Sequence, residues 1–338
     1  MKLFRISLMI VVSVLLFLLF SFLVLTLMHE SFEGYDDKFA KPEPADAHGV
    51  SVRFMGNTNL LFSDGDTNIL IDGWFSRPSL LSLAVGRIEP DLTAITDAFE
   101  KGKIGKLAAV IPVHSHYDHA MDSPEVARRT GAQLLGSEST ANIARGWGLS
   151  ENQIDVVQLN ESYQYGDFSV TLIPSEHFEF PNANLREAAL GDIQITQPLV
   201  PPAKVTDYKM GGAFTVYIKH PRGNVLVQGS AGFTPNALDS LSADVVFLGV
   251  GGINLQTDKY RKAYWKHIVE ATNPSKIYPV HWDSLTDSLG DKPVTQNLLF
   301  SSFLKVSSTS SLSYTFANAD KDNIDIALLP MWKPINLF

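Results

Sequence analysis

Hydrophobic and polar positions divide the chain into a long apolar run, a short polar segment and a large region of short elements. Residues 6–28 carry no charge, and only four hydroxyl side chains interrupt the apolar ones. At ~1.5 Å of rise per residue, this run forms a helix of about 35 Å, long enough to cross a hydrocarbon core of about 30 Å. The pattern therefore predicts a transmembrane helix near the N-terminus.

The residues that flank this run predict how it lies in the membrane. Lys2 and Arg5 precede it, whereas four acidic residues follow it between positions 30 and 37. Basic residues stay on the cytoplasmic side, which places the N-terminus in the cytoplasm and the rest of the chain on the exported side. A cleaved signal peptide has a shorter apolar region of roughly 7–15 residues, followed by small residues. We therefore expect residues 1–28 to form an uncleaved, single-pass signal anchor.

The remaining pattern predicts a linker and one α/β domain. Residues 29–48 are rich in Asp, Glu, Lys and Pro and predict a short extended linker. From residue 49 to residue 338, strand-like and helix-like runs alternate without a repeat or a second linker. The expected strands lie at 52–55, 59–62, 68–72, 107–113, 134–136, 156–159, 169–173, 213–219, 224–228 and 245–248. The expected helices lie at 90–101, at 124–130 with Ser123 as the capping residue, and at 258–271.

Residues 182–210 interrupt this alternation. They contain three prolines between positions 198 and 202 and show no clear period. A loop of this length in a compact domain is usually a lid or a binding loop. We expect it to bring apolar side chains to the mouth of a site: Leu185, Ile193, Ile195, Leu199 and Val200.

Composition narrows the chemistry that the domain can support. The 338 residues include no cysteine, which excludes a disulfide framework, a thiolate zinc site and a thiol nucleophile. Any metal must therefore be held by histidines and carboxylates. The 27 basic residues against 36 acidic ones give a net charge of −9. We expect no nucleic-acid partner, because binding phosphates requires a basic face.

A cluster of histidines directly follows the apolar strand at 107–113. It reads His114-Ser-His116-Tyr-Asp118-His119. Alternate residues of an extended segment point the same way, so His114 and His116 converge on one point. Asp118 and His119 lie beyond the strand end and can turn toward an adjacent point. The spacing therefore predicts two metal positions a few Å apart, because imidazoles are rarely stacked without a metal between them.

This motif resembles that of the metallo-β-lactamase superfamily, and the resemblance covers residues 50–300. It implies a four-layer αββα sandwich, with the transmembrane helix as an addition. By the same resemblance, His177 is the third histidine of the first metal site and His281 is the last histidine of the second. Asp72 ends a strand on the same side and is either a residue that orients a ligand histidine or a turn aspartate before glycine.

The sequence departs from the superfamily pattern at Ser230. The superfamily usually has an aspartate there that bridges both metals, and a neutral hydroxyl is a poor substitute. We therefore expect one tightly bound zinc ion at His114, His116 and His177. A weaker, labile second ion is expected at Asp118, His119 and His281. With one metal bound, Asp118 is free to act as a general base or to orient the attacking water.

These expectations favour a membrane-anchored zinc hydrolase. Its metal-bound hydroxide would attack an ester, a lactone or a phosphodiester in a small-molecule or lipid-like substrate. The alternative is a non-catalytic metal-binding or interaction protein of the same fold, which lost activity together with the bridging carboxylate. The sequence does not indicate an oligomeric state.

Overall fold

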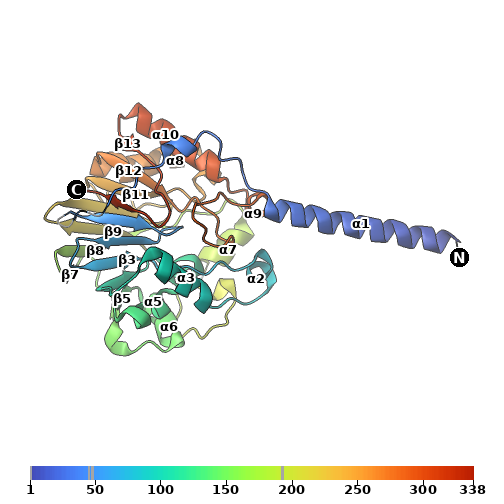
Figure 1. The fold of residues 1–338 in the computed structure, drawn as a ribbon, viewed down its shortest axis with the longest axis horizontal. Helices are drawn as coiled ribbons and strands as arrows, with labels where there is room; N and C mark the ends of the chain where they lie inside the picture. Colours follow the sequence, from blue (N-terminus) through green and yellow to red (C-terminus); the bar gives the residue numbers. More distant parts are fainter. Residues whose placement is uncertain (1, 45, 47–48, 192–193) are drawn as a thin grey trace.

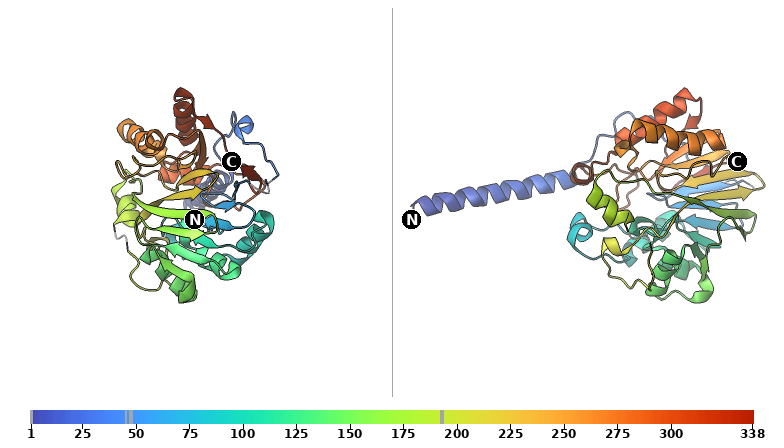
Figure 2. Two further views of the ribbon diagram at one scale, coloured as in Figure 1. Left: turned by 90° about the vertical axis from the view of Figure 1, so that its left-hand side faces the viewer. Right: turned by 180° about the vertical axis from the view of Figure 1, so that it is seen from behind.

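A long N-terminal helix projects from a body of two facing sheets with helices outside them (Figure 1). The computed structural model describes residues 2–44, 46, 49–191 and 194–338. Two views from other sides show the same four layers, helix–sheet–sheet–helix (Figure 2). The predicted α/β fold with two mixed sheets is confirmed.

The first sheet has seven strands in the order β14-β1-β2-β3-β4-β5-β6. Its antiparallel part is a meander with β14 added at the edge, and its parallel part begins where β4 joins β3. The strands are β1 (Ser51–Phe54), β2 (Leu60–Ser63), β3 (Asn68–Ile71), β4 (Ala109–Ile111), β5 (Gln133–Gly136), β6 (Ile154–Val156) and β14 (Pro334–Asn336).

The second sheet also has seven strands, in the order β13-β12-β11-β10-β9-β8-β7. Strands β7 to β10 pair antiparallel, and β10 to β13 pair parallel. The strands are β7 (Ser162–Tyr165), β8 (Phe168–Ser175), β9 (Ala213–His220), β10 (Gly223–Gln228), β11 (Val245–Gly249), β12 (Lys276–Val280) and β13 (Asp325–Ile326).

Helices cover the outer faces of both sheets and one end of the sandwich (Figures 1 and 2). They are α1 (Lys2–Leu27), α2 (Leu80–Val85), α3 (Leu92–Gly102), α4 (Tyr117–Ala120), α5 (Ser123–Thr130), α6 (Glu138–Trp147), α7 (Ala183–Leu190), α8 (Asp258–Trp265), α9 (Leu298–Leu304) and α10 (Ser308–Lys321). Short helical turns lie at Asp36–Lys38, Glu151–Gln153, Val205–Asp207 and Ile253–Leu255, and the π-helical turn Lys266–Glu270 extends α8.

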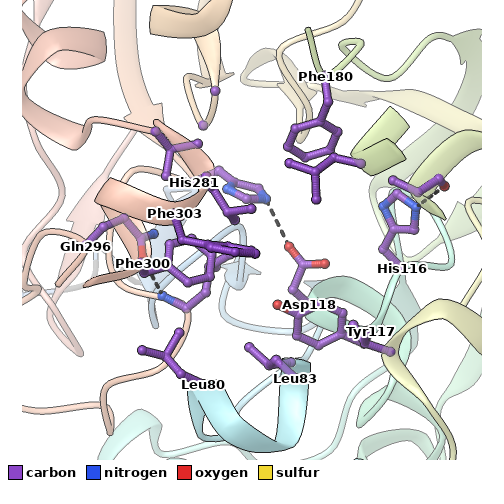
Figure 3. Close-up of a pocket in the computed structure, with 18 of the residues that line it drawn as sticks. Leu80, Leu83, His116, Tyr117, Asp118, Phe180, His281, Gln296, Phe300 and Phe303 are labelled. Carbon is purple, nitrogen blue, oxygen red and sulfur yellow. Dashed lines mark hydrogen bonds and ion pairs between the residues drawn. The ribbon is translucent and has the colours of Figure 1, made fainter. Parts of the chain in front are cut away.

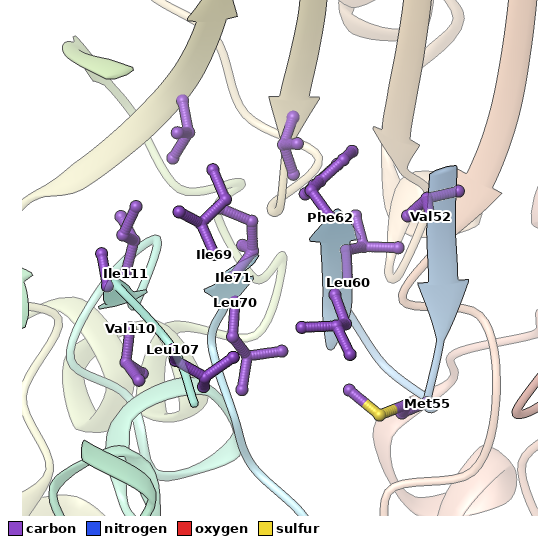
Figure 4. Packing of buried hydrophobic residues seen from close by; sticks show 14 of the residues in the cluster. Val52, Met55, Leu60, Phe62, Ile69, Leu70, Ile71, Leu107, Val110 and Ile111 are labelled. Carbon is purple, nitrogen blue, oxygen red and sulfur yellow. The ribbon is translucent and has the colours of Figure 1, made fainter. Parts of the chain in front are cut away.

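The main core lies between the two sheets. Strand β3 is buried on both faces, since Ile69, Leu70 and Ile71 all have no exposed surface. Figure 4 shows Ile69 and Ile71 pointing toward the other sheet, whereas Leu70 points to the helix side. Across the interface, Phe62 packs edge-on against Phe247 with ring centroids 5.4 Å apart. Truncating such a ring to alanine typically costs about 3–5 kcal/mol.

The helix α1 contains the span Met9–Leu27, which is long and apolar enough to cross a membrane and none of whose residues is fully buried inside the protein. It ends at the domain surface, where it contacts α9. The amide of Leu298 at the start of α9 donates to the carbonyl of Met28, 2.7 Å away. The residue that follows α1 is therefore already bound to the domain, and no flexible linker separates the two.

The segment after α1 is held against the domain. The Glu30 carboxylate accepts from Ser301 Oγ at 3.1 Å, from Ser307 Oγ at 3.1 Å and from both the amide and the hydroxyl of Thr309 at 3.0 Å. These partners surround the N-terminus of α10, where a negative charge is favourable. The ring of Phe32 stacks on Trp282 at 5.0 Å. The first part of the expected linker is thus extended but docked, which fixes how α1 leaves the domain.

On the opposite outer layer, Glu125 in α5 gathers three donors. Its carboxylate accepts from Arg128 at 2.8 Å, from Arg129 at 2.7 Å and from the indole of Trp147 at 2.9 Å. Burial disfavours the charged form, but these hydrogen bonds outweigh it and lower the pKa of Glu125 to about 2. Glu125 therefore stabilises the fold above the pKa of an unfolded glutamate, about 4.3, and this contribution is lost as the pH falls toward 2.

We expect Glu125→Gln to lower the unfolding temperature at pH 7, because the neutral amide pairs less well with two guanidinium groups. The difference from the wild type should shrink between pH 5 and pH 2.5. Thermal unfolding of both proteins across this range measures it. A difference that stays constant with pH would show that the charge of Glu125 is not what stabilises this layer.

Candidate metal centre

The six predicted ligands lie at strand ends on one edge of the sandwich. His114 and His116 follow β4, whereas Asp118 and His119 lie in the short helix α4. His177 follows β8, and His281 follows β12. Figure 3 shows His116, Asp118 and His281 facing a common space. Two chain segments that are distant in sequence thus complete the set begun by the histidine motif.

The ligand atoms form two adjacent groups, each with its atoms within 4.8 Å of one another: His114, His116 and His177 in the first, and Asp118, His119 and His281 in the second. His114 Nε2 is 3.0 Å from His116 Nδ1. Asp118 Oδ2 is 3.2 Å from His281 Nε2 and 3.5 Å from His119 Nε2. The two groups match the two predicted sets of ligands.

Hydrogen bonds on the outer side of three rings select the nitrogen that faces inward. His177 Nδ1 donates to the carbonyl of Phe178 at 2.8 Å, and His116 Nε2 donates to that of Ala189 at 3.1 Å. His119 Nδ1 donates to Asp72 Oδ2 at 2.7 Å. The inward nitrogen of each ring therefore carries a lone pair, as a metal ligand must.

Unpartnered buried atoms provide a test of whether the residues fit a metal. Among the described residues, His119 Nε2 and Ser230 Oγ are buried without a hydrogen-bond partner. Buried polar atoms are rarely left unpaired, because this costs about 1–3 kcal/mol. His119 Nε2 belongs to the second group of ligand atoms. A cation between these atoms would satisfy it, so the donor set fits a metal ion.

The electrostatics of the site favour neutral imidazoles in the first group. Burial and the neighbouring His116 together lower the pKa of His177 to about 3. Burial likewise holds the pKa of His114 well below its usual value.

In the second group, burial alone would lower the pKa of His119, but Asp72 and Asp118 outweigh it and raise that pKa. Burial alone would raise the pKa of Asp118, but His119 and His281 outweigh it and lower that pKa. Neutral imidazoles around a carboxylate are the state that binds a divalent cation.

Asp72 connects the first sheet to this centre. Besides His119, its carboxylate accepts from the amide of Val113 at 2.9 Å and from the hydroxyl of Thr58 in a short hydrogen bond. It has no exposed surface and a positive φ of 62°. Of the two interpretations of Asp72, the geometry favours the one in which it orients a ligand histidine.

We expect Asp72→Asn to weaken metal binding at the second group by about 10–100-fold, because the amide cannot hold His119 in the same tautomer equally well. The affinity of the first group should stay within a few-fold of the wild type. Competition titration with a chromophoric chelator measures both. Equal affinities in the two proteins would show that Asp72 is only a turn residue.

Ser230 lies in the turn after β10. This turn packs against both chain segments that carry the first group of ligands, the one before His114 and the one before His177. A Cβ on Gly229 would come within 2.5 Å of Val113, which precedes His114. A Cβ on Gly232 would come within 1.9 Å of the carbonyl oxygen of Glu176, which precedes His177. These contacts require glycine and press the turn against the ligand segments. Ser230 is buried there with a free hydroxyl.

Three residues that support the site were not identified in the sequence. The side-chain amide of Asn57 donates to the backbone carbonyl of Asp118 at 2.5 Å. The backbone carbonyl of Asn57 accepts from the backbone amide of His281 at 3.0 Å. Thr58 contacts Asp72, as described above. Ser123 was expected to cap α5, but its hydroxyl donates to the carbonyls of Asp72 and His119. The only sequence signal was a polar Gly-Asn-Thr-Asn turn between apolar strands, which is also typical of an exposed hairpin.

A cavity of about 510 Å³ opens onto Asp118, His116, His177 and His281. Its walls are mostly aliphatic and aromatic, as Figure 3 shows for Leu80, Leu83, Phe180, Phe300 and Phe303. The metal ligands therefore lie at the bottom of an apolar pocket.

The segment 182–210 contributes to this pocket differently from the expectation. It contains the helix α7, which Asn182 caps by accepting from two backbone amides. Leu185 lines the cavity, whereas Ile195 does not line it but is buried in the hydrophobic cluster that forms part of its wall, against which Leu199 packs. Val200 is exposed, and Ile193 lies outside the described residues. The carbonyl of Ala189, which the sequence did not single out, is what connects this segment to His116.

Comparison with known proteins agrees with this arrangement. A family model described as a beta-lactamase superfamily domain matches residues 67–192, which include five of the predicted ligands. A protein of Anaeromyxobacter dehalogenans named UPF0173 metal-dependent hydrolase is 27% identical over 140 residues, which are 40% of this chain and 46% of that protein. Residues 67–192 therefore carry a domain of the beta-lactamase superfamily.

Two further comparisons show the extent of the likeness. A UPF0173 metal-dependent hydrolase of Thermus thermophilus is 29% identical over 143 residues, which are 42% of this chain and 54% of that protein. The chain spans about half the length of the curated relatives that it matches. The solved structure of a metallo hydrolase from Ignicoccus hospitalis superposes with a TM-score of 0.50 at 15% identity, covering 86% of this chain and 98% of that one. This structure shows a shared fold.

Proposed function

We propose that the protein is a membrane-anchored, zinc-dependent hydrolase. The observation that carries the proposal is the pair of ligand groups, with inward lone pairs on His116, His119 and His177 at the bottom of a pocket. Three imidazoles with an open fourth position are typical of catalytic zinc, and the chain offers no thiolate. The names of the relatives as metal-dependent hydrolases support the same reaction type.

The reaction would be the hydrolysis of an ester, a lactone or a phosphodiester. For an ester, the acyl C–O bond breaks, the hydroxyl of water joins the acyl carbon, and the second proton of water goes to the departing oxygen. A divalent metal supplies Lewis acidity and makes a bound water more acidic. The carboxylate of Asp118 is ionised and lies in the pocket wall, where it can orient the attacking water and accept a proton from that water. His281 fixes that carboxylate by its 3.2 Å contact.

The second candidate function is that of a protein that binds metal without catalysing a reaction. It is favoured by Ser230, which stands where the superfamily usually has a metal-bridging aspartate. Both candidates predict metal binding, and only the hydrolase predicts catalysis. Purified protein should contain bound zinc by elemental analysis and should hydrolyse members of a panel of chromogenic esters, lactones and phosphodiesters. Absence of metal after expression with zinc would refute both, whereas zinc without hydrolysis of any substrate would favour the binding protein.

We also propose that residues 1–28 anchor the domain on the exported side of a membrane. The apolar run and the basic residues before it support this topology. Full-length protein should fractionate with membranes at its unprocessed length, and external protease should digest the domain in intact spheroplasts. A mature N-terminus mapped just after Met28 would show that the run is a cleaved signal peptide.

A further inference from the structure

The pocket of the candidate metal centre extends to the apolar N-terminal helix. Phe22 of α1, Leu80 of α2 and Phe303 of α9 line the same cavity as Asp118 and His281. Phe22 lies within the candidate membrane span Met9–Leu27. A continuous apolar wall therefore runs from the lateral surface of that helix to the metal ligands.

The position of this opening relative to the helix is fixed. The Glu30 carboxylate binds four donors around the start of α10, and Met28 binds the start of α9. Because no free spacer separates α1 from these contacts, the domain cannot turn its pocket away from the helix without breaking them. A membrane that contains α1 would therefore lie against the pocket opening.

The rim of the pocket exposes large apolar side chains. Leu81 is 69% exposed, Val85 is 80% exposed and Phe303 is 75% exposed. The helices that carry them, α2 and α9, lie on the face of the domain from which α1 projects (Figures 1 and 2). Exposed apolar side chains gathered on one face usually mark an interaction surface. The departure of α1 from this same face identifies the bilayer as the occupant.

The charges of the residues that line the cavity indicate whether the polar group of the ligand is charged. Among the described residues that line the cavity, there is no lysine or arginine. Phosphate groups are generally held by Arg, Lys or helix N-termini in addition to any metal. The N-terminus of α10, whose Ser307 and Ser308 line the cavity, already binds the Glu30 carboxylate. The pocket thus suits an uncharged polar group attached to a hydrocarbon chain.

We propose that the substrate is an uncharged, long-chain acyl ester or lactone that enters the metal centre sideways from the bilayer, between α2 and α9. The exposed side chains of these helices rest in the membrane surface. The chain lies along the apolar wall, and the carbonyl group reaches the metal ligands. This substrate class rests on the proposed hydrolase function, whereas the contact with the bilayer does not depend on it.

The contact with the bilayer can be tested without activity, because the chain has no cysteine. Val85→Cys and Phe303→Cys allow a single polarity-sensitive nitrobenzoxadiazole label at the rim of full-length protein in phosphatidylcholine vesicles. Gln164→Cys is the matched control, since Gln164 is also exposed and pairs with Ser169 near the start of β8, at the end opposite to the one that leads to His177. Nitroxide-bearing lipids should quench the two rim labels and not the control. Equal quenching at all three sites, or none at the rim, would overturn the proposal, and so would a dimer that buries the rim.

The substrate class can be tested with p-nitrophenyl acetate, p-nitrophenyl laurate in vesicles and bis(p-nitrophenyl) phosphate. Zinc-loaded wild type should prefer the laurate. Val85→Asp, at a position outside the pocket lining, should reduce laurate hydrolysis at least about fivefold by weakening contact with the bilayer, and should leave acetate hydrolysis unchanged. Gln164→Asp, which introduces the same charge near the turn from β7 to β8, should change neither. Loss of all hydrolysis in the wild type would refute the hydrolase. Acetate hydrolysis without a laurate preference, or a preference for the phosphodiester, would refute only the inferred substrate.

Discussion

Replacing His114 by alanine is expected to abolish both tight metal binding and hydrolysis. The first group has only three ligand side chains, and His114 is fully buried among the other histidines. Removing an orienting group outside a metal site typically costs about 10–100-fold in affinity, and loss of a ligand itself should cost more. Elemental analysis after dialysis should show less than a tenth of the wild-type zinc in the first group.

His281→Ala should behave differently. It removes a ligand of the second group, so the first metal should remain while activity falls, because Asp118 loses the contact that fixes its carboxylate. His267→Ala is the matched control, because His267 lies in the outer layer, where it accepts from the amide of Asn236 and stacks on Phe233. Equal loss of zinc in the His114 and His281 variants would contradict two distinct groups. Unchanged zinc in the His114 variant would refute the proposed metal centre.

Replacing Ser230 by aspartate is expected to raise the metal content from near one ion toward two. The turn that carries Ser230 is pressed against the ligand segments, and its hydroxyl is buried without a partner among the described residues. A carboxylate there adds one negative charge near both groups. Attraction between unit charges about 4 Å apart is about 4 kcal/mol at an effective dielectric of 20, before the cost of desolvating the carboxylate. This exceeds the 1.4 kcal/mol that a tenfold gain in affinity requires.

Ser230→Asn is the matched control, because it has nearly the same shape as aspartate without the charge. It should leave the stoichiometry near one. Titration with zinc, followed by elemental analysis and calorimetry, measures all three proteins. Wild-type protein that already binds two ions with similar high affinity would contradict the expected weakness of the second site.

Within the part of the chain that the structure describes, neither Asp283 nor Asp244 takes the place of the missing carboxylate. Asp283 uses both of its oxygens to accept from the amide of Asn57. Asp244 accepts from the amide of Asn224, at the opposite end of β10. Among the described residues, the two ligand groups contain Asp118 as their one carboxylate. The charge of the centre thus depends on Asp118 and on what occupies position 230.

Local sequence pattern was enough to predict the parts of the fold that have a strong short-range signal. The apolar run at 6–28, the hairpin strands β1 and β2 and the buried strand β4 follow from hydrophobic periodicity alone. The motif from His114 to His119 was visible because its spacing after an apolar strand is unusual. His177 and His281 were identified by the resemblance to the superfamily, since single histidines carry no signal of their own.

Elements with weaker patterns were missed. The helices α6 and α10 and the strand β7 were not predicted, and α7 was taken for part of a loop. The residues of α7 include small and polar ones without a strong apolar stripe, so its helical period is faint. Its helical state is decided by Asn182 at its start and by its contact with the metal centre through Ala189.

The features that concern function most depend on contacts between residues far apart in the chain. Glu30 meets Thr309 across 279 positions, and Phe22 meets the pocket only because α9 packs against α1. A local pattern records whether a side chain is polar or apolar, which is enough to predict a helix or a metal ligand. The partner that a polar side chain finds, and the direction in which a pocket opens, depend on the folded arrangement of both sheets. This arrangement brings the N-terminal helix, the pocket and the histidines together at one end of the domain.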